Sequence, residues 1–494
     1  MRGHPRRDLE RETQQGYRLE QVVADLVDNC VDAGAENVEI IFNEEMYIEK
    51  KSHYLIVLDD GIGIEEDKIS SIMDFGVERE YDELDLGKFG VGLKSSSLSQ
   101  AKEITVMSKK KGGNINLRRL SYQEVWDRDQ WVLLPMLRPE METHAIDVAT
   151  DVLNSQPSGT AVVLEDMHKL DLQVGHEDQK DEYLNSEYSI IREYLSLVFE
   201  RYLTGLTLKR SDGSEETKEL NIFFNGKHDM LEPLDPFCRD LKDGSQTGTL
   251  CLKEIVKLSS GETIKEVPVT IWITPKANDR PSSLDGRLRV ASRDLSIREM
   301  QGIYFYRNGR LVDFPGWKKV LKVEEHMTCL RWEVEFPPHL DKMFQLDPSK
   351  REVKIAAQLR ESFIELTKRK IRWHNDDEQT ANHRARARTR QSGKDAIKPV
   401  TKQTTLKKTR LNQESQKTTT TIVNPLSKSS KTTSAQPLNK VKINKIAGSK
   451  TGHVVINEKQ EGGTWNISLN TNHAMYESFV EAIIEGSDLP DRSD

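Results

Sequence analysis

The stretch Leu19–Ala33 constrains this chain more than any other, because its apolar residues recur at helical spacing. They are Leu19, Val22, Val23, Leu26, Val27 and Cys30, and they define the buried face of an amphipathic helix. Asp25, Asn29 and Asp32 form one stripe on the other side, at about 100° per residue. Two carboxylates and an amide on one stripe can hold a Mg²⁺ ion and a water. Taken alone, the stripe is more simply a solvated polar face.

A second motif follows the apolar run 54–58, which predicts a buried strand. The sequence Asp59-Asp60-Gly61-Ile62-Gly63 places a carboxylate at the strand end and two glycines directly after it. A carboxylate in this position can accept a hydrogen bond, and the glycines let the backbone pass close to a flat ligand.

A third motif is rich in glycine and runs from Gly87 to Ser95. It leads into a predicted helix over 93–100, and bare amides at a helix N-terminus form a phosphate cradle. The spacing G-x-x-G-x-G fits the Rossmann pattern poorly, and no Walker P-loop sequence occurs. The loop alone is weak evidence, but the three motifs in this order together indicate a nucleotide site.

The order of the motifs resembles the GHKL ATPases, which include gyrase B, the ninety-kilodalton heat-shock chaperone, histidine kinases and MutL. The resemblance implies an α+β nucleotide domain with the Bergerat fold, a mixed sheet with helices on one face. Gly159-Thr160, before an apolar run, matches a further family motif that helps to bind adenine. The phrases at 26–29, 59–63, 90–95 and 223–226 also resemble the MORC and MORC-like branch.

The resemblance implies ATP and Mg²⁺ as cofactors and assigns roles to residues. Asn29 is the expected metal ligand, Asp59 the adenine-reading carboxylate, and Gly61 and Gly63 the residues that let the base approach. A lid that wraps the triphosphate contains Gly87, Gly90 and Gly92. The nucleotide-binding residues expected besides these are Asp32, Lys88, Phe89, Val91, Leu93, Lys94 and Thr160.

One departure from the family pattern concerns the general base. The family usually places Glu four residues before the motif Asn, whereas this chain has Asp25 there. Asp is shorter by one methylene, roughly 1.5 Å of reach, and a misplacement of about 1 Å can cost on the order of a hundredfold in rate. Asp25 remains a carboxylate, so we expect slow hydrolysis. Asp28 is the poorer candidate because it lies toward the edge of the stripe.

In gyrase-like, MutL-like and MORC-like proteins an S5-type α/β transducer follows the nucleotide domain and sends a lysine to the γ-phosphate. By that resemblance Lys350, in a loop before a predicted helix, is the second expected catalytic residue. Lys342 competes with it, and an ordinary surface lysine is the simpler interpretation. The Asn308-Gly309 turn is flanked by Arg307 and Arg310, which serve DNA, a dimer interface or only solvent.

The chain divides into an N-terminal arm (1–18), a GHKL ATPase domain (19–205), an S5-like transducer domain (206–374), a basic disordered linker (375–450) and a small C-terminal α/β module (451–494). The arm, with Tyr17, is expected to reach a partner protomer. In the ATPase domain, strands are predicted at 38–42, 54–59, 104–109, 115–121, 131–137 and 160–165, and helices at 65–75 and 184–203. In the transducer, strands are predicted at 220–224, 249–252, 267–273, 302–306 and 330–336, and helices at 316–320 and 352–372. Two strands and a helix over 474–485 are predicted for the last module.

Charge separates the linker from the rest of the chain. Residues 383–450 hold 17 Lys and Arg against 2 Asp and Glu, in a chain of 494 residues with a net charge of −8. Few apolar residues are available to bury there, so we expect disorder and salt-sensitive, sequence-independent binding of DNA. A soluble linker without ligand is the alternative. The isolated cysteines and the lack of an 18-residue apolar run favour a cytoplasmic protein, or a nuclear one in a eukaryote, without a membrane segment.

These expectations combine into an ATP-dependent conformational clamp that hydrolyses ATP slowly, forms a homodimer when ATP binds and acts on DNA. Repair, compaction and defence against foreign DNA are equally compatible with the residues. Two alternatives stay open: an ATP-binding scaffold with little turnover, and a chaperone-like ATPase with protein clients. The module 451–494 is expected to dock on the same chain, the second protomer or another protein.

Overall fold

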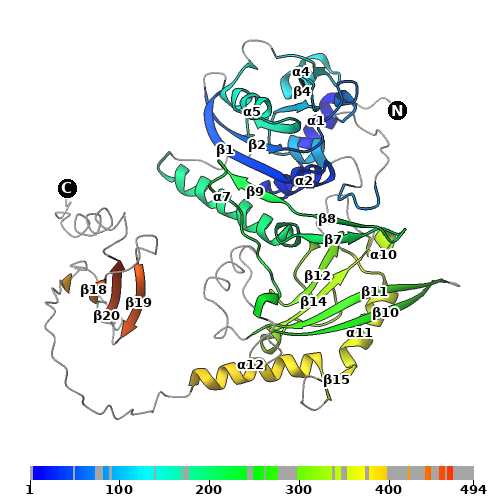
Figure 1. The fold of residues 1–494 in the computed structure, drawn as a ribbon, viewed down its shortest axis with the longest axis vertical. Helices are drawn as coiled ribbons and strands as arrows, with labels where there is room; N and C mark the ends of the chain where they lie inside the picture. Colours follow the sequence, from blue (N-terminus) through cyan, green and yellow to red (C-terminus); the bar gives the residue numbers. More distant parts are fainter. Residues whose placement is uncertain are drawn as a thin grey trace. The chain divides into compact units, whose positions relative to one another are not determined.

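The computed structural model describes residues 4–47, 50–72, 82–87, 92–137, 141–168, 170, 177–241, 249–260, 263–275, 298–336, 340–345, 353–372, 378–397, 421–422, 440–446, 455–461 and 464–470. The chain forms two compact units, Met1–Pro399 and Val400–Asp494. The described residues of the first unit form two large sheets and two small strand pairs. We call each large sheet with its covering helices a lobe, N-terminal and second in chain order (Figure 1).

The N-terminal lobe is built on a seven-stranded sheet with the order β5-β4-β3-β6-β2-β1-β9. Its strands are β1 (Asn37–Tyr47), β2 (Lys50–Asp59), β3 (Glu103–Lys109), β4 (Ile115–Ser121), β5 (Leu133–Leu134), β6 (Gly159–Glu165) and β9 (Asn221–Phe224). All neighbours are antiparallel except β1 and β9, which are parallel. The predicted mixed α+β architecture is therefore confirmed for this lobe.

Helices cover both faces of this sheet, so the expectation of helices on one face was wrong. Leu26 on α2 and Ile191 on α7 share one apolar core with the strand residues Ile104 and Leu164. Ala149 on α5 packs on the opposite face with strand residues. Alternate strand residues are buried on both sides, and an exposed sheet face would leave one set in water. The helices are α1 (Pro5–Thr13), α2 (Leu19–Asp32), α3 (Ile69–Ile72), α4 (Tyr122–Arg128), α5 (His144–Ser155), α7 (Glu177–Val198) and α8 (Glu200–Leu203).

Strand β9 corrects the predicted start of the second domain. Sequence analysis assigned 220–224 to the transducer, but this strand pairs with β1 at the edge of the first sheet. Ile222 and Phe224 are buried in the core of the N-terminal lobe. The chain thus returns to the first sheet after α7 and α8, and the pairing partner lies more than 180 residues earlier in the sequence.

The second lobe is a five-stranded sheet with the order β10-β11-β14-β12-β13. Its strands are β10 (Leu250–Ser260), β11 (Thr263–Ile273), β12 (Gly302–Arg307), β13 (Arg310–Asp313) and β14 (Leu330–Glu335). Four of the predicted strands are confirmed here, with β10 and β11 longer than expected, and β13 was not predicted. The predicted helix over 316–320 is wrong, because Lys318 and Lys319 adopt positive φ in a turn. Within 352–372, the helix is shorter, α11 (Ala357–Lys368).

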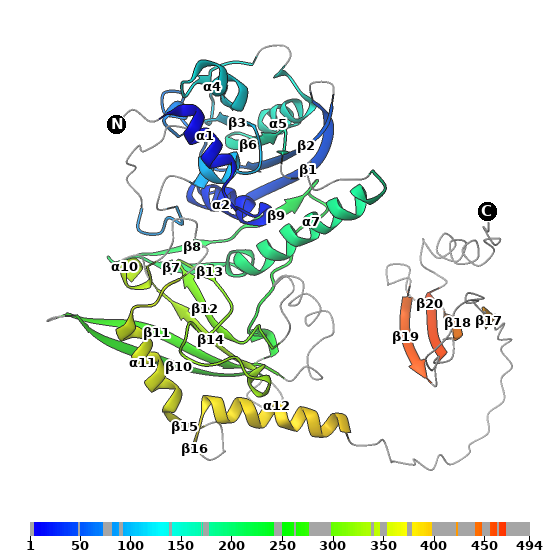
Figure 2. The ribbon, with the colours of Figure 1, turned by 180° about the vertical axis from the view of Figure 1, so that it is seen from behind.

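Short elements complete this unit. They are the β7 (Leu206–Lys209) and β8 (Glu215–Lys218) hairpin, α10 (Asp341–Phe344), the π-helical turn η1 (Gly92–Ser96), the 3₁₀ turns η3 (Arg239–Leu241) and η5 (Glu325–Met327), and the strand pair β15 (Lys370–Arg372) and β16 (Glu378–Thr380). In both views, α7 lies between the two lobes (Figures 1 and 2).

Helix α12 (Ala381–Ile397) corrects the predicted disorder at the start of the basic segment. Ala381 and Ala385 are buried in the apolar core of the second lobe. Arg388 is only 5% exposed and donates to the carbonyls of Ile273 (3.0 Å) and Thr274 (3.1 Å) at the end of β11. The small residues between the arginines let α12 pack closely against the second lobe. The basic composition of this segment therefore did not mean that it is solvated.

The N-terminal segment folds onto its own lobe. The Arg6 side chain donates to the carbonyls of Trp126 and Asp127 at the end of α4, and α1 and α4 lie side by side (Figure 2). Tyr17 is only 9% exposed, and its carbonyl accepts a hydrogen bond from Gln100. The part of the arm that the structure describes is thus packed within the chain.

The second unit contains a four-stranded sheet with the order β17-β18-β20-β19. The strands are β17 (Thr421–Ile422), β18 (Lys440–Ile446), β19 (Val455–Glu461) and β20 (Thr464–Asn470). β17 and β18 fall inside the predicted disordered linker, and β18 pairs in parallel with β20. The predicted helix over 474–485 lies outside the described residues. No helix in the described parts of the chain is both long and apolar enough to span a membrane.

Two of the arginines of α12, Arg388 and Arg386, allow a matched test of this packing. Arg388→Ala removes charged hydrogen bonds to buried carbonyls and should lower the free energy of unfolding by about 2–3 kcal/mol. Arg386→Ala removes a half-exposed ion pair with Glu324 and should cost less than about 1 kcal/mol. Urea unfolding followed by tryptophan fluorescence measures both, and equal small losses would contradict the packed helix.

Candidate functional site

The first part of the site is the polar stripe of α2. The apolar face of this helix is buried in the N-terminal core as predicted, and the stripe runs from buried to exposed. Asp25 is 8% exposed, Asn29 is exposed and Asp32 is half-buried. The amide of Asn29 is therefore accessible to a ligand, while the carboxylate of Asp25 lies deeper.

The second part is the end of β2, where Asp59 lies only 5% exposed and one carboxylate oxygen accepts the N–H of Gly61 at 2.8 Å. A Cβ on Gly61 would lie 2.8 Å from the carbonyl oxygen of Ala33, just after α2. Gly63 has φ +67°, and its Cβ would lie 2.1 Å from the carbonyl oxygen of Lys109. Glycine is required at both positions, because the loop passes between α2 and β3.

Thr160 lies directly beside Asp59, since the two residues are register partners on β6 and β2. Sequence analysis missed Ser108, which ties these elements together. Its hydroxyl lies 3.0 Å from the Gly159 carbonyl and 2.9 Å from the Thr160 hydroxyl, and it accepts the N–H of Ile64 at 2.8 Å. Ser108 is one of several polar residues in β3, so nothing in the sequence distinguished it.

Two carboxyl groups of the site, those of Asp59 and Asp32, have raised pKa values. Burial raises the pKa of Asp59 to about 7, although hydrogen bonds from Gly61, Cys30 and Thr160 oppose the shift. Burial also raises the pKa of Asp32 to about 6, opposed by the amides of Leu86 and Gly87. Desolvation penalises a carboxylate more than a carboxylic acid, which is the cause of both shifts.

Asp32 holds the segment that leads to the glycine-rich lid. Its two carboxylate oxygens accept the N–H groups of Leu86 and Gly87, each at 2.7 Å. Both oxygens are thus engaged within the protein here. Lys88, Phe89, Gly90 and Val91 lie outside the described residues. Gly92, Leu93 and Lys94 are in η1, and the Lys94 side chain is only 1% exposed.

Lys350 also lies outside the described residues, and its competitor Lys342 is in α10. The placement of the expected transducer lysine therefore stays a prediction. The second lobe does reach the site, but through arginines.

Arg307 and Arg310 are neither solvated nor free for DNA, since they are 6% and 3% exposed. Arg310 Nε donates to Asp28 Oδ1 at 2.6 Å, and its Nη2 lies 3.9 Å from Asp25 Oδ1. Arg307 pairs with Asp341 at 3.1 Å. The sequence could not show these partners, because Arg310 and Asp28 are 282 residues apart.

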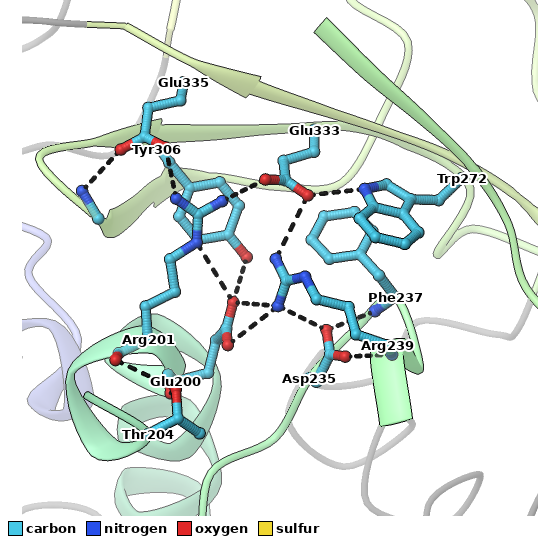
Figure 3. Close-up of polar contacts among 11 residues, drawn as sticks. Glu200, Arg201, Thr204, Asp235, Phe237, Arg239, Trp272, Tyr306, Glu333 and Glu335 are labelled. Atoms are coloured by element: carbon cyan, nitrogen blue, oxygen red, sulfur yellow. Dashed lines mark hydrogen bonds and ion pairs between the residues drawn. The ribbon is translucent and has the colours of Figure 1, made fainter. Parts of the chain in front are cut away.

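A half-buried ionic network joins α8 to the sheet of the second lobe (Figure 3). Arg201 on α8 pairs with Glu333 (2.5 Å) and Glu335 (2.7 Å) on β14, and its guanidinium lies 3.7 Å from the centre of the Tyr306 ring. Arg239 joins Glu200 to Glu333, at 3.0 and 3.3 Å. The network connects α8, which follows α7, to the sheet of the second lobe.

A metal site must use few protein ligands here. Among the described residues, no group of three or more His, Cys, Asp and Glu side chains is arranged to hold a metal ion. Mg²⁺ in nucleotide sites takes one or two protein oxygens and completes its shell with phosphates and water. The exposed amide of Asn29, one helical turn after Asp25 on α2, fits that requirement.

The comparisons with known proteins agree with this geometry. Residues 17–160 match the family model described as histidine kinase-, DNA gyrase B- and HSP90-like ATPase. The GHKL resemblance of this segment is confirmed. The match begins before α2 and ends at Thr160, so it includes every motif of the nucleotide site that the sequence singled out.

The MORC likeness also appears among curated relatives. ATPase MORC2 of Homo sapiens and ATPase MORC2A of Mus musculus are each 33% identical to this chain over 90 residues, and ATPase MORC2B of Mus musculus is 30% identical over 95 residues. Each match covers 18% of this chain and 9% of the relative. The chain thus matches only a small part of these longer proteins.

A solved structure titled "Crystal Structure of N terminal domain of a DNA repair protein" is similar over 73% of this chain and 95% of that chain. The identity is 14% and the TM-score is 0.40.

The raised pKa of Asp59 predicts how stability depends on pH. The carboxyl group of Asp59 has a pKa of 3.8 in the unfolded chain and of about 7 in the folded chain. The folded state therefore keeps a proton that the unfolded state loses, and stability falls as pH rises from 4 through 7, by about 1.4 kcal/mol for each pKa unit.

Asp59→Asn should remove this contribution. The difference in free energy of unfolding between the wild type and the variant, measured in urea at pH 5 to 8, should change in favour of the variant as pH rises. A difference that is independent of pH, or of the opposite slope, would contradict the burial of an ionisable Asp59.

Proposed function

We propose that the N-terminal lobe binds ATP with Mg²⁺ and hydrolyses it slowly. One observation carries the proposal: the end of α2, the carboxylate of Asp59 and the Gly61 backbone meet so closely that Gly61 has no room for a Cβ. The buried carboxylate of Asp59 accepts a hydrogen bond from the amino group of adenine. Gly61 and Gly63 carry no side chain that would block the adenine ring. The family match over residues 17–160 supports this use.

Asn29 is the proposed Mg²⁺ ligand, with ATP phosphates and water as the remaining ligands. The ion would supply charge neutralisation at the phosphates when bound. Gly87, Gly92, Leu93 and Lys94 belong to the proposed phosphate-binding lid, together with residues 88–91.

Asp25 is the proposed general base for the attacking water. It is the buried carboxylate of the stripe, one helical turn from Asn29. Its carboxylate reaches about 1.5 Å less far than the Glu that the family usually places here. Slow turnover follows from that shorter reach.

A scaffold that binds ATP with little turnover is the second candidate, and Arg310 favours it. The guanidinium lies 3.9 Å from Asp25, and a nearby positive charge makes a carboxylate a weaker base. The two functions differ in turnover and share the same binding site.

The clamp action, the homodimer and the DNA client complete the proposal. The support for DNA is the basic composition beyond α12: residues 398–450 hold 12 Lys and Arg against 1 Glu. Of the arginines in α12, Arg386 and Arg388 are committed to contacts within the chain. DNA binding by this segment should be sequence-independent and should weaken with salt.

Substitutions of Asp25 test the catalytic part of the proposal. Asp25→Glu should raise phosphate release by roughly tenfold or more, because the longer side chain restores the reach of the base. Asp25→Asn should abolish release and leave ATP binding in place, because the base is lost while the adenine contacts remain.

Phosphate release at saturating Mg·ATP, with ATP affinity by calorimetry, measures both effects. An Asp25→Asn variant that hydrolyses ATP like the wild type would remove Asp25 from the mechanism. Wild-type chain that binds ATP without any phosphate release would establish the scaffold instead.

A further inference from the structure

The Arg307–Arg310 turn of the second lobe contacts two parts of the proposed nucleotide site at once. Toward α2, Arg310 pairs with Asp28 at 2.6 Å and approaches Asp25 at 3.9 Å. These carboxylates are three residues apart, on one side of the helix. A single guanidinium therefore neutralises both carboxylates on the inner part of α2.

Arg310 is also held by an aromatic contact. Its guanidinium lies 5.6 Å from the centre of the Phe199 ring, between α7 and α8. Burial opposes the charge, but Asp28, Tyr194 and Asp25 outweigh it, so the pKa of Arg310 is raised above its ordinary value. Removing one partner of such a buried pair leaves an uncompensated charge.

On the side of the lid, the same turn forms hydrogen bonds to the segment 82–87. Arg307 donates to the carbonyl of Asp85 at 2.9 Å, and the Asn308 side chain donates to the carbonyl of Glu83 at 3.0 Å. Asp32 of α2 holds the amides of the same segment from the other side. The residues before the glycine-rich lid are thus fixed between α2 and the second lobe.

The turn is itself well supported. Asn308 (φ 48°) and Gly309 (φ 77°) form a tight two-residue connection between β12 and β13. The Tyr202 hydroxyl donates to the Asn308 carbonyl at 2.6 Å, and Glu335 accepts the Gly309 N–H at 3.2 Å. Glu335 is in turn held by Arg201 of the ionic network in Figure 3. The backbone from which Arg307 and Arg310 project is therefore fixed by α8 and β14.

We propose that the Arg307–Arg310 turn positions the catalytic parts of the site, with Arg310 acting as a positioning residue that holds α2, and with it Asp25, at the working distance for ATP hydrolysis. The inference rests on the proposed ATPase function. Asp59 and Gly61, which bind the base in that proposal, form no hydrogen bond or ion pair with Arg310 among the described residues, and β2 is held by its own pairing with β1 and β6. They therefore depend less on Arg310 than Asp25 does. Loss of Arg310 also removes a charge that weakens Asp25 as a base, but a displaced base lowers the rate by more than that gain raises it. Turnover should therefore fall far more than ATP affinity.

The test compares Arg310→Gln and Arg310→Lys with the wild type in the full-length chain. A shift of α2 by about 1 Å costs up to about a hundredfold in rate, so kcat of Arg310→Gln at saturating Mg·ATP should fall by at least about tenfold. The ATP dissociation constant from calorimetry should change by less than about threefold, which is under 0.7 kcal/mol. Arg310→Lys keeps the charge and should retain more of kcat. If Arg310→Gln does not fold, kcat of Arg310→Lys should still fall by about threefold or more, because lysine cannot make the same paired contacts, and an unchanged kcat would contradict the inference.

Arg119→Gln is the matched control for the loss of a buried arginine. Arg119 is fully buried and pairs with two carboxylates, Glu103 (3.0 Å) and Glu165 (2.6 Å). It belongs to the sheet face that α5 covers, opposite α2. This variant should lose stability while each folded molecule keeps the wild-type kcat, and urea unfolding gives the folded fraction of every variant.

The outcomes separate the inference from the proposed function. ATP binding by the wild type with an unchanged kcat in Arg310→Gln overturns the inference alone. So does an equal fall of kcat in the Arg119→Gln control, since the effect would then follow from stability. A wild-type chain that binds no ATP overturns the proposed function, and the inference with it.

Discussion

The ion pair between Arg310 and Asp28 is the contact on which the arrangement of the site depends. It joins the sheet of the second lobe to α2, and both side chains are almost completely buried. A buried pair of this kind contributes little net stability, because desolvation offsets most of the attraction, but breaking it costs about 3–5 kcal/mol. Its main effect is therefore on geometry: α2 can carry an inner row of carboxylates only while the second lobe supplies the opposite charge.

The nucleotide pocket is defined by backbone packing as much as by side chains. Gly61 and Gly63 let the loop after β2 lie directly against the end of α2 and the end of β3. Ser108 and Thr160 then fix the neighbouring strands on the other side of Asp59. The carboxylate that would read adenine is thereby buried in a fixed position, which is the condition for selective recognition of a base.

Local sequence predicted the elements whose signal is local. The periodicity of Leu19–Cys30 gave α2, and the run before Asp59 gave β2, together with the glycines that follow it. Contacts between distant segments were not predictable, and the errors concentrate there. Strand β9 joins β1 across the chain, α12 uses arginines for packing, and Arg310 finds Asp28 in another lobe. In each case the role of the residue depends on a partner far away in the sequence, and the neighbouring residues do not reveal that partner.

The most direct test of the account is calorimetry of the full-length chain with Mg·ATP and Mg·GTP at about pH 8, above the pKa of Asp59. Asp59 offers a hydrogen-bond acceptor, which matches the amino group of adenine and opposes the carbonyl at the same place on guanine. The account predicts one ATP bound per chain and GTP weaker by at least about tenfold, or 1.4 kcal/mol. No heat of binding with ATP, or equal affinity for the two nucleotides, would contradict it.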